Sequence, residues 1–169
     1  VAIAFMHSYK NGVHELEAAE IAREIGFTQI SVSHNVSALM KLVGRGDTTV
    51  VDAYLSPILR RYVEQVRDAL DDGEQDQKQL LFMQSSGGLT DASLFQGKDA
   101  ILSGPAGGGV GMVKTAAQAG HDRLIGFDMG GTSTDVCHFA GSYERSFDTE
   151  VAGVRMRAPM MNIHTVAAG

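Results

Sequence analysis

The sequence predicts an α/β fold, because short apolar runs with strand character alternate along the chain with longer segments of helical periodicity. Glycine or polar turn residues separate most of these segments. No internal repeat and no low-complexity tract interrupts the alternation. Strand and helix candidates therefore follow one another from the first residues to the last.

Composition places the chain among globular proteins, with 44% hydrophobic and 20% charged residues in a length of 169. A net charge of −6 argues against a nucleic-acid partner. The single cysteine, Cys137, excludes an internal disulfide and suits a reducing, cytoplasmic setting. The longest uncharged stretch, residues 100–113, is shorter than the ~20 apolar residues of a membrane span, so no membrane partner is expected.

The first elements expected are a strand, a helix and a second strand. Residues 2–6 are apolar and precede a polar turn, which indicates a short strand and a loop. From residue 13 to residue 25 the apolar side chains recur on one helical face, and Gly26 stands where a helix commonly ends. Residues 29–33 alternate polar with apolar side chains and predict a strand that ends near His34.

The longest expected helix comes next. Asp47 can cap its first turn with a carboxylate, and apolar residues then recur at helical spacing as far as Leu70. Pro57 lies inside this pattern, and because its ring removes one hydrogen-bond donor we expect a kink or a break near residues 55–56. Residues 71–78 are charged and contain glycine, which predicts a solvated surface loop.

The second half of the chain continues the alternation. Residues 80–83 predict a buried strand, a turn at residues 85–88 follows it, and a weak helix is expected at residues 91–95. A helix rich in small residues is expected over residues 107–120, and it leads into a strand at residues 124–127.

The strongest chemical signal lies directly after that strand, in a hairpin between two β-rich runs. Five residues suited to holding phosphate stand between two acids: Gly130, Gly131, Thr132, Ser133 and Thr134 between Asp128 and Asp135. Glycines let backbone N–H groups approach an anion closely, and the hydroxyls add donors around the same point. The carboxylates can hold a hydrated Mg²⁺ or orient an attacking water. The alternative is a tight turn whose acids bond only to its own backbone.

Two neighbouring glycine-rich segments match nucleotide motifs less well. Residues 104–109 lead into a helix as a dinucleotide fingerprint does, but Ala106 takes the place of the second glycine and Pro105 stiffens the turn. Lys114 ends the stretch as in a P-loop, yet Val113 replaces the glycine that must precede it. We reject the P-loop interpretation.

Residues 103–136 resemble the connecting helix and second phosphate loop of the actin, sugar-kinase and heat-shock-chaperone ATPase superfamily. Within it the chain most resembles the hydantoinase A/5-oxoprolinase group, in residues 31–34, 46–55, 83–89, 103–108 and 128–135. Residues 40–47 and 153–161 are more similar to 5-oxoprolinase than to N-methylhydantoinases. Asn35 and Ser86 depart from the pattern, where many relatives carry Glu and Asn, but neither lies in the phosphate hairpin.

This resemblance implies a partial actin-like, ribonuclease H-like ATPase fold that spans the end of one lobe and the start of a second. Residues 1–102 would form the C-terminal part of the first lobe, residues 103–120 the connecting helix, and residues 121–169 the start of the second lobe with its phosphate-binding hairpin. The chain begins without methionine and stops directly after a hydrophobic run, so we expect an internal fragment that is itself inactive.

The resemblance also implies an activity, the ATP-dependent hydrolysis of a cyclic amide, with 5-oxo-L-proline becoming L-glutamate. ATP and Mg²⁺ would be the cofactors, and Asp128 and Asp135 the catalytic acids, with Asp128 at the metal directly or through water. The fragment would work with the rest of its polypeptide or with a hydantoinase B-like subunit, in an oligomer. An N-methylhydantoinase-type ring opening, a sugar-kinase-like phosphotransferase and a non-catalytic nucleotide-binding module remain open.

None of the six histidines in the chain lies at the spacing from another that metal-binding histidines show. His7, His34 and His164 are candidates for the substrate pocket, because polar residues in loops beside strands often line such sites. His138, beside the hairpin, is a comparable candidate.

Overall fold

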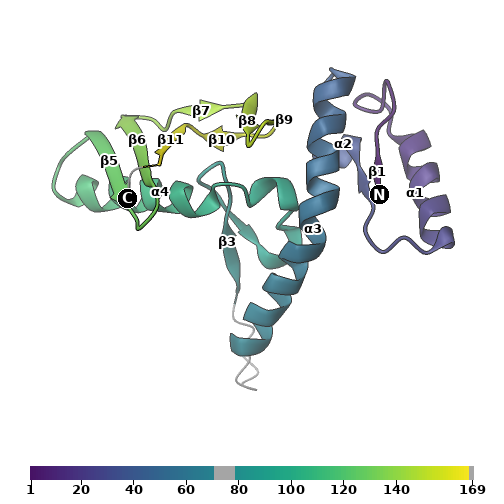
Figure 1. Cartoon of the computed structure of the whole chain (residues 1–169), viewed down its shortest axis with the longest axis horizontal. Coiled ribbons are helices and arrows are strands. Elements are labelled where there is room, and N and C mark those ends of the chain that lie inside the picture. Colours follow the sequence, from purple (N-terminus) through teal and green to yellow (C-terminus); the bar gives the residue numbers. More distant parts are fainter. Residues whose placement is uncertain (71–78, 168–169) are drawn as a thin grey trace.

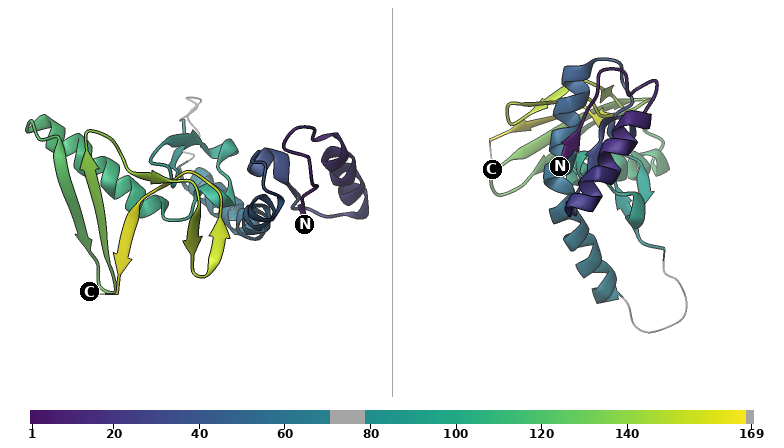
Figure 2. Two further views of the ribbon diagram at one scale, coloured as in Figure 1. Left: turned by 90° about the horizontal axis from the view of Figure 1, so that it is seen from above. Right: turned by 90° about the vertical axis from the view of Figure 1, so that its right-hand side faces the viewer.

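The structure of the chain is a computed structural model that describes residues 1–70 and 79–167 (Figure 1). A long helix, α3 (Leu42–Leu70), divides it: the first strands and helices lie on one side of α3, and the later elements extend away on the other. The left view of Figure 2 shows the same elongated arrangement from above, and the right view looks along its long axis. The surface loop predicted for residues 71–78 lies outside the described residues. No described helix is both long enough and apolar enough to cross a bilayer.

The first unit consists of two short parallel strands joined by a helix. β1 (Ala2–Ile3) pairs with β2 (Ser31–Val32), and α1 (Val13–Ile25) connects them. The predicted helix is confirmed, and Gly26 ends it in the left-handed conformation, with φ 104°. Both strands are shorter than predicted, because the chain turns into the short helix α2 (Ser33–Val36) directly after β2.

Helix α3 differs from its prediction at its start and near its proline. It begins at Leu42 rather than at Asp47, and Asp47 instead forms a partly exposed ion pair with Arg155 at 3.4 Å. Of the kink or break predicted near residues 55–56, the break does not occur: α3 continues through Pro57 without interruption. The second half of α3 is held by an apolar cluster in which its Val63 meets Ala92 and Phe95.

A buried carboxylate joins α1 to the loop after β1 and to α2. The Glu15 side chain accepts hydrogen bonds from the Phe5 backbone N–H at 2.8 Å, the Ser33 hydroxyl, and both the backbone N–H and ring Nδ1 of His34, at 3.0 and 2.6 Å. Burial would raise the pKa of the Glu15 carboxyl, but the hydrogen bonds from Ser33, His34 and Phe5 outweigh it and hold the pKa at about 2. Glu15 is therefore an ionised hub inside the protein.

A buried arginine on α3 extends this hub. Arg45 is fully buried, and its Nε donates to the Ser33 hydroxyl at 2.8 Å, which in turn donates to Glu15. Its two terminal nitrogens donate to four backbone carbonyl oxygens, those of Phe5, Met6, Leu39 and Met40. Two of these carbonyls precede the first turn of α3, so Arg45 fixes the chain that enters the helix. This contact explains why α3 starts earlier than a capping rule predicts.

The middle of the chain packs against the second half of α3. β3 (Leu81–Met83) and β4 (Leu89–Asp91) form a hairpin, and two short 3₁₀ turns follow, η1 (Ala92–Leu94) and η2 (Gly97–Asp99). The weak helix predicted for residues 91–95 is thus the end of a strand followed by η1. Gly97 needs to be glycine, because a Cβ there would lie 2.8 Å from the Ser56 backbone nitrogen of α3.

The last part of the chain is a helix with a three-stranded antiparallel sheet. α4 (Ser103–Gln118) packs against the sheet of order β11-β6-β5, formed by β5 (Arg123–Met129), β6 (Thr134–Ala140) and β11 (Ile163–Val166). Four short strands connect β6 to β11: β7 (Arg145–Ser146), β8 (Thr149–Val151), β9 (Val154–Met156) and β10 (Met160–Met161). The loop after β9 is tied to α3, because the Arg157 N–H donates to Thr48 Oγ1 at 2.8 Å.

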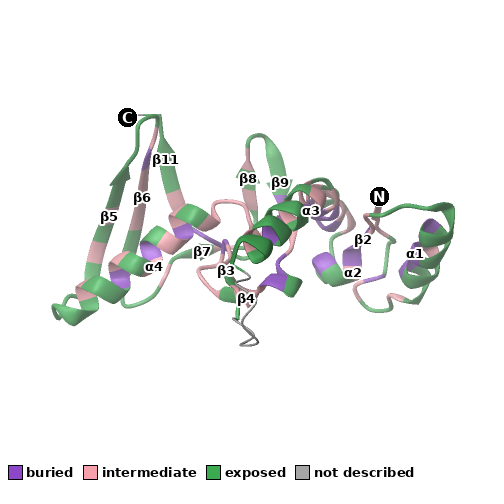
Figure 3. Cartoon of the chain, turned by 90° about the horizontal axis from the view of Figure 1, so that it is seen from below, coloured by how far each residue is buried: buried purple, intermediate pink, exposed green. Residues whose placement is uncertain are grey.

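Strand β5 lies at the edge of this sheet and is exposed along most of its length (Figure 3). Ile125, Phe127 and Met129 alternate along it, with 75%, 67% and 61% of their surface accessible. A run of large apolar side chains on an open edge is unusual for a soluble domain.

The glycines of α4 serve different purposes. Gly109 faces the sheet, and a Cβ at that position would lie 3.0 Å from Met161 Cε and 3.3 Å from Cys137 Sγ. Gly111 has no heavy atom within 4 Å of such a Cβ. Helix α4 therefore packs closely at Gly109 and not at Gly111.

Replacing Glu15 by glutamine should destabilise the folded protein, because the amide cannot accept the same set of hydrogen bonds. The carboxyl has a pKa of about 2 in place of the ordinary 4.5, which corresponds to ~3 kcal/mol in favour of the folded state. A lowered pKa stabilises fully above pH ~4.5 and loses that contribution as the pH falls towards 2. Urea unfolding at several pH values should show the gap between wild type and Glu15→Gln closing across that window.

Glu17→Gln is the matched control, because Glu17 lies on the same helix with an exposed side chain that meets only exposed His14, at 3.6 Å. We expect it to change the unfolding curve little at any pH. A gap that stays constant between pH 5 and pH 2 in the Glu15 variant would contradict the hub assignment.

Gly111→Ala should raise the stability of the protein by up to ~1 kcal/mol, because alanine in an open mid-helix position restricts the unfolded chain and meets no neighbour. Gly109→Ala should lose that gain, since the new methyl group presses on Met161 and Cys137. Thermal unfolding of the two variants measures the difference. Equal shifts would show that α4 does not pack closely at Gly109.

Candidate functional site at the β5–β6 hairpin

The predicted hairpin is confirmed. β5 and β6 pair antiparallel in a register that places Asp128 opposite Asp135 and Met129 opposite Thr134. Residues 130–133 connect the strands, and the Gly130 N–H donates to the Ser133 carbonyl oxygen at 2.8 Å. One of the amides proposed to face phosphate is therefore used inside the turn.

The two glycines of the turn are not required by the turn itself. Neither Gly130 nor Gly131 has a positive φ, so their backbone conformations are open to other residues. A Cβ on Gly131 would meet nothing within 4 Å, and one on Gly130 would lie 3.5 Å from the Ser133 carbonyl oxygen, an ordinary contact. The simple tight-turn interpretation does not explain why both positions are glycine.

Several hydrogen-bond donors around the turn lack partners among the described residues. These are the backbone N–H groups of Gly131 and Thr132 and the hydroxyls of Thr132 and Ser133. Thr132 is exposed and Ser133 partly so, whereas Thr134 belongs to β6 and is buried, at 1% exposure. The free donors thus cluster at the tip of the hairpin, where an anion can reach them.

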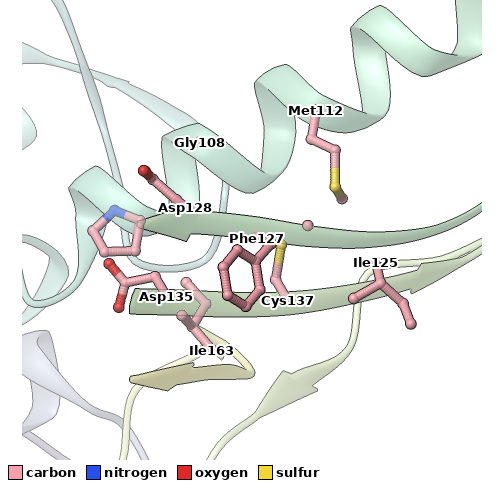
Figure 4. A pocket seen from close by; sticks show the side chains of 10 residues that line it. Gly108, Met112, Ile125, Phe127, Asp128, Asp135, Cys137 and Ile163 are labelled. Atoms are coloured by element: carbon pink, nitrogen blue, oxygen red, sulfur yellow. The ribbon is translucent and has the colours of Figure 1, made fainter. Parts of the chain in front are cut away.

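Both acids line a pocket of about 350 Å³ between α4 and the sheet (Figure 4). Its wall on α4 is formed around Gly108, where a Cβ would lie 3.9 Å from Asp128 Oδ2. The rest of the lining is largely apolar, with Met112, Ile125, Phe127 and Ile163. The pocket therefore has two carboxylates at one end and a mainly hydrophobic body, the usual composition of a small-molecule site.

The two carboxylates differ in how they are held. Asp135 Oδ1 accepts a hydrogen bond from the Thr165 hydroxyl at 2.6 Å, and Thr165 stands opposite Asp135 in the β11–β6 ladder. The Asp128 carboxylate accepts no hydrogen bond from the described residues, and Asp128 is exposed near the end of β5. Asp135 is a fixed carboxylate, and Asp128 is free to meet a ligand.

The carboxylates of Asp128 and Asp135 fit a magnesium ion whose remaining ligands come from other molecules. Mg²⁺ in nucleotide sites commonly takes one or two carboxylates and completes its shell with water and phosphate oxygens. No group of three or more His, Cys, Asp or Glu side chains gathers as a metal site within the described part of the chain. Asp128 and Asp135 would therefore contribute to a shared site and would not form a complete protein cage.

Cys137 also lines the pocket, two residues beyond Asp135 on the same strand. Burial raises the pKa of its thiol, and a hydrogen bond from the Gly126 backbone only partly opposes this. The thiol is therefore neutral at neutral pH and contributes to the apolar wall.

The candidate histidines are not brought together. His7 lies in the loop after β1 and His34 on α2, tied to Glu15, whereas His164 is exposed on β11 at the other end of the molecule. None of the three lines the hairpin pocket. His138 points to Glu144, with Nδ1 and Oε1 2.7 Å apart, and this contact, with one from Asn162, lowers the pKa of Glu144.

Sequence reasoning missed Thr165 and the helix wall of the pocket. Thr165 lies in a β-branched run, Ile163–Val166, whose alternation indicates a strand but not its neighbour in the sheet. Its partner, Asp135, is 30 residues earlier, so only the register of β11 on β6 reveals the contact.

Comparison with known proteins shows extended similarity. The family model for hydantoinase/oxoprolinase matches residues 45–169. Two 5-oxoprolinases align with the whole chain, at 43% identity in Dictyostelium discoideum and 46% in Saccharomyces cerevisiae. The alpha subunit of a caprolactamase from Pseudomonas jessenii aligns at 35% identity. The chain spans only 14%, 13% and 25% of the lengths of these three relatives.

Two solved structures share the fold. The nucleotide-free structure of an acetone carboxylase matches 99% of the chain with a TM-score of 0.85 and 24% identity, over 24% of its own length. An ATP-dependent caprolactamase from Pseudomonas jessenii matches all of the chain with a TM-score of 0.81 and 32% identity, over 25% of its length. The expected α/β, actin-like ATPase fold, present in part, is thereby confirmed.

Proposed function

The chain belongs to the hydantoinase/oxoprolinase family, and from this premise we propose that it supplies the phosphate-binding hairpin of an enzyme that opens a cyclic amide with ATP. The substrate proposed is 5-oxo-L-proline and the product L-glutamate, as the names of the relatives at 43% and 46% identity suggest. Because the chain spans about one seventh of those relatives or less, the activity is assigned to the longer protein of which this sequence would be a part.

The single observation that carries the proposal is the pair of acids at the hairpin. Asp128 and Asp135 face each other across paired strands and line one pocket, directly beside a turn with free N–H and hydroxyl donors. The turn holds two glycines that its own geometry does not require. A phosphate group that approaches the backbone closely would explain both features.

We assign roles to these residues as follows. Gly130, Gly131, Thr132, Ser133 and Thr134 would surround the terminal phosphates of ATP. Gly131 and Thr132 would donate backbone N–H groups, Thr132 and Ser133 hydroxyls, and buried Thr134 would hold the strand end. Asp128, whose carboxylate has no hydrogen-bond partner among the described residues, would hold magnesium directly or through water, and Asp135 would orient a water in its shell.

The reaction balances with one ATP and two waters. A lactam carbonyl is a poor electrophile, and moving the terminal phosphoryl group of ATP onto its oxygen turns that oxygen into a leaving group. One water opens the C–N bond of the ring, and a second releases inorganic phosphate. ADP, phosphate and the ring-opened amino acid result, and the amide nitrogen leaves as an amine that takes up a proton.

The remaining parts of the enzyme would come from elsewhere. We place residues 1–102 at the end of a first lobe, residues 103–120 in a connecting helix and residues 121–169 at the start of a second lobe. The rest of the polypeptide, or a hydantoinase B-like subunit, would complete the site; the relative named as an alpha subunit favours such a partner. We further propose a cytoplasmic, oligomeric enzyme that uses Mg²⁺.

Other functions fit the hairpin less completely. An N-methylhydantoinase-type enzyme would use the same phosphate site on another ring, and a non-catalytic nucleotide-binding module would keep the donors without turnover. The higher identity to 5-oxoprolinases than to the caprolactamase subunit favours 5-oxoproline. Assaying the full-length protein with ATP and either 5-oxo-L-proline or hydantoins distinguishes these cases.

Asp128→Asn in the full-length protein should reduce 5-oxoproline-dependent ATP turnover by roughly 10²-fold or more, because an amide supplies no charge for magnesium. The measurement is the release of ADP together with labelled glutamate from labelled 5-oxo-L-proline, in equal amounts. Asp122→Asn, just before the same strand and exposed, is the control and should retain turnover. Full activity in the Asp128 variant would refute its assignment.

Thr165→Val should reduce turnover by about 10-fold and raise the Mg²⁺ concentration needed for half-maximal rate, because Asp135 loses the hydroxyl that fixes it. Thr165→Ser keeps the hydroxyl and should restore both values. A variant that merely disturbed the strand would be rescued no better by serine than by alanine. Unchanged magnesium dependence in Thr165→Val would exclude this positioning role.

A further inference from the structure

A second pocket, of about 210 Å³, lies on a different part of the molecule from the hairpin. It is enclosed by β2, α2, one face of α3 and the η1 turn, and it shares no lining residue with the first pocket. Its wall is rich in hydroxyl and amide side chains and includes one acid and one arginine, Asp52 and Arg60. Nothing in the proposed hairpin chemistry uses these residues.

The acid of this pocket, Asp52, is buried, and no cationic side chain among the described residues pairs with it. Asp52 is 4% exposed and accepts hydrogen bonds only from neutral donors: the hydroxyls of Ser31 at 2.7 Å and Ser56 at 3.2 Å, and the Lys98 backbone N–H at 3.3 Å. The Lys98 ammonium pairs instead with Asp99, at 2.8 Å. No cationic side chain pairs with Asp52 among the described residues, although a buried carboxylate is normally compensated by one.

A second hydrogen-bond acceptor in the same wall, the side-chain oxygen of Gln29, lacks a donor among the described residues. The Gln29 side-chain nitrogen donates to Ser31 Oγ at 2.9 Å, and that hydroxyl donates to Asp52. Gln29 Oε1 is buried and has no donor among the described residues. The Asp52 end of the pocket therefore offers acceptors to a ligand that carries N–H groups.

The arginine of this pocket supplies the opposite chemistry. Arg60 follows Asp52 by two helical turns on the same face of α3, with Ser56 between them. Arg60 contributes to the lining of the pocket while remaining exposed to solvent. It has no ion-pair partner in the described part of the chain, and a guanidinium binds a carboxylate through two parallel hydrogen bonds.

We propose that this pocket binds a small molecule carrying both a carboxylate and an N–H or ammonium group, with the carboxylate on Arg60 and the nitrogen on Asp52. A volume of about 210 Å³ is smaller than the roughly 300–1,000 Å³ of pockets that take drug-sized ligands, which suits an amino acid or a carboxylated five-membered lactam. Both the substrate and the product of the proposed reaction belong to this class. Resting on that proposed function, the ligand is one of these two compounds, bound at a site separate from the hairpin pocket.

The test is equilibrium dialysis of the full-length protein, without ATP, against radiolabelled L-glutamate and 5-oxo-L-proline in separate arms. Arg60→Gln should weaken binding at one site per chain by about 10-fold or more, because the carboxylate loses its charged partner. Arg61→Gln, the same change on the next residue, is the matched control, since Arg61 is exposed and does not line the pocket. It should bind as the wild type does.

Further arms separate this site from the hairpin. Asp52→Asn should weaken L-glutamate binding. If Asp52→Asn fails to fold, the Arg60→Gln variant still tests the pocket, because Arg60 is exposed and its replacement does not disturb the core. Glutarate, which has the carboxylates but no nitrogen, should not displace the label. Asp128→Asn should leave the binding at this pocket intact. The Asp128 variant therefore tests the proposed function, and the Arg60 variant tests the pocket independently. An Arg60→Gln variant that binds as many molecules of label per chain as the wild type, and as tightly, overturns the proposal, and so does a wild type that binds neither ligand.

Discussion

The fold depends on a buried polar chain that runs from Arg45 through Ser33 to Glu15. It joins three segments, namely α3, α2 and α1, and it ties the loop after β1 to them. Each charge is fully buried and surrounded by hydrogen-bond partners, which makes the geometry specific: any shift of one segment leaves a charged group without its partner. The first unit therefore keeps one orientation on α3.

Helix α3 then acts as the common support of the molecule. Its first turns hold the buried arginine and, through Thr48, the loop after β9; its middle face carries Asp52, Ser56 and Arg60; its last turns pack against the η1 segment. Residues distant in sequence thus take fixed positions relative to one helix. The hairpin site is supported separately, by the close contact of α4 with the sheet at Gly109.

Local patterns predicted the elements that depend on local physics. The periodicity of α1, its glycine end and the β5–β6 hairpin all follow from neighbouring residues, and so does the group of donors and acids at the turn. The start of α3 was not predictable in this way, because the guanidinium of Arg45 stabilises it through carbonyls that precede the helix. Thr165 and Asp52 were missed for the same reason: their partners come from segments far along the chain.

The open edge of the sheet has a consequence for handling the protein. No described strand pairs with the outer edge of β5, and this edge, flanked by Ile125, Phe127 and Met129, forms a template on which an extended chain can add a strand. A preparation limited to this sequence would therefore tend to self-associate through strand addition, with solubility falling as concentration rises. Because Asp128 lies on the same strand, another segment must cover this edge if the hairpin acids are to meet small molecules and not neighbouring chains.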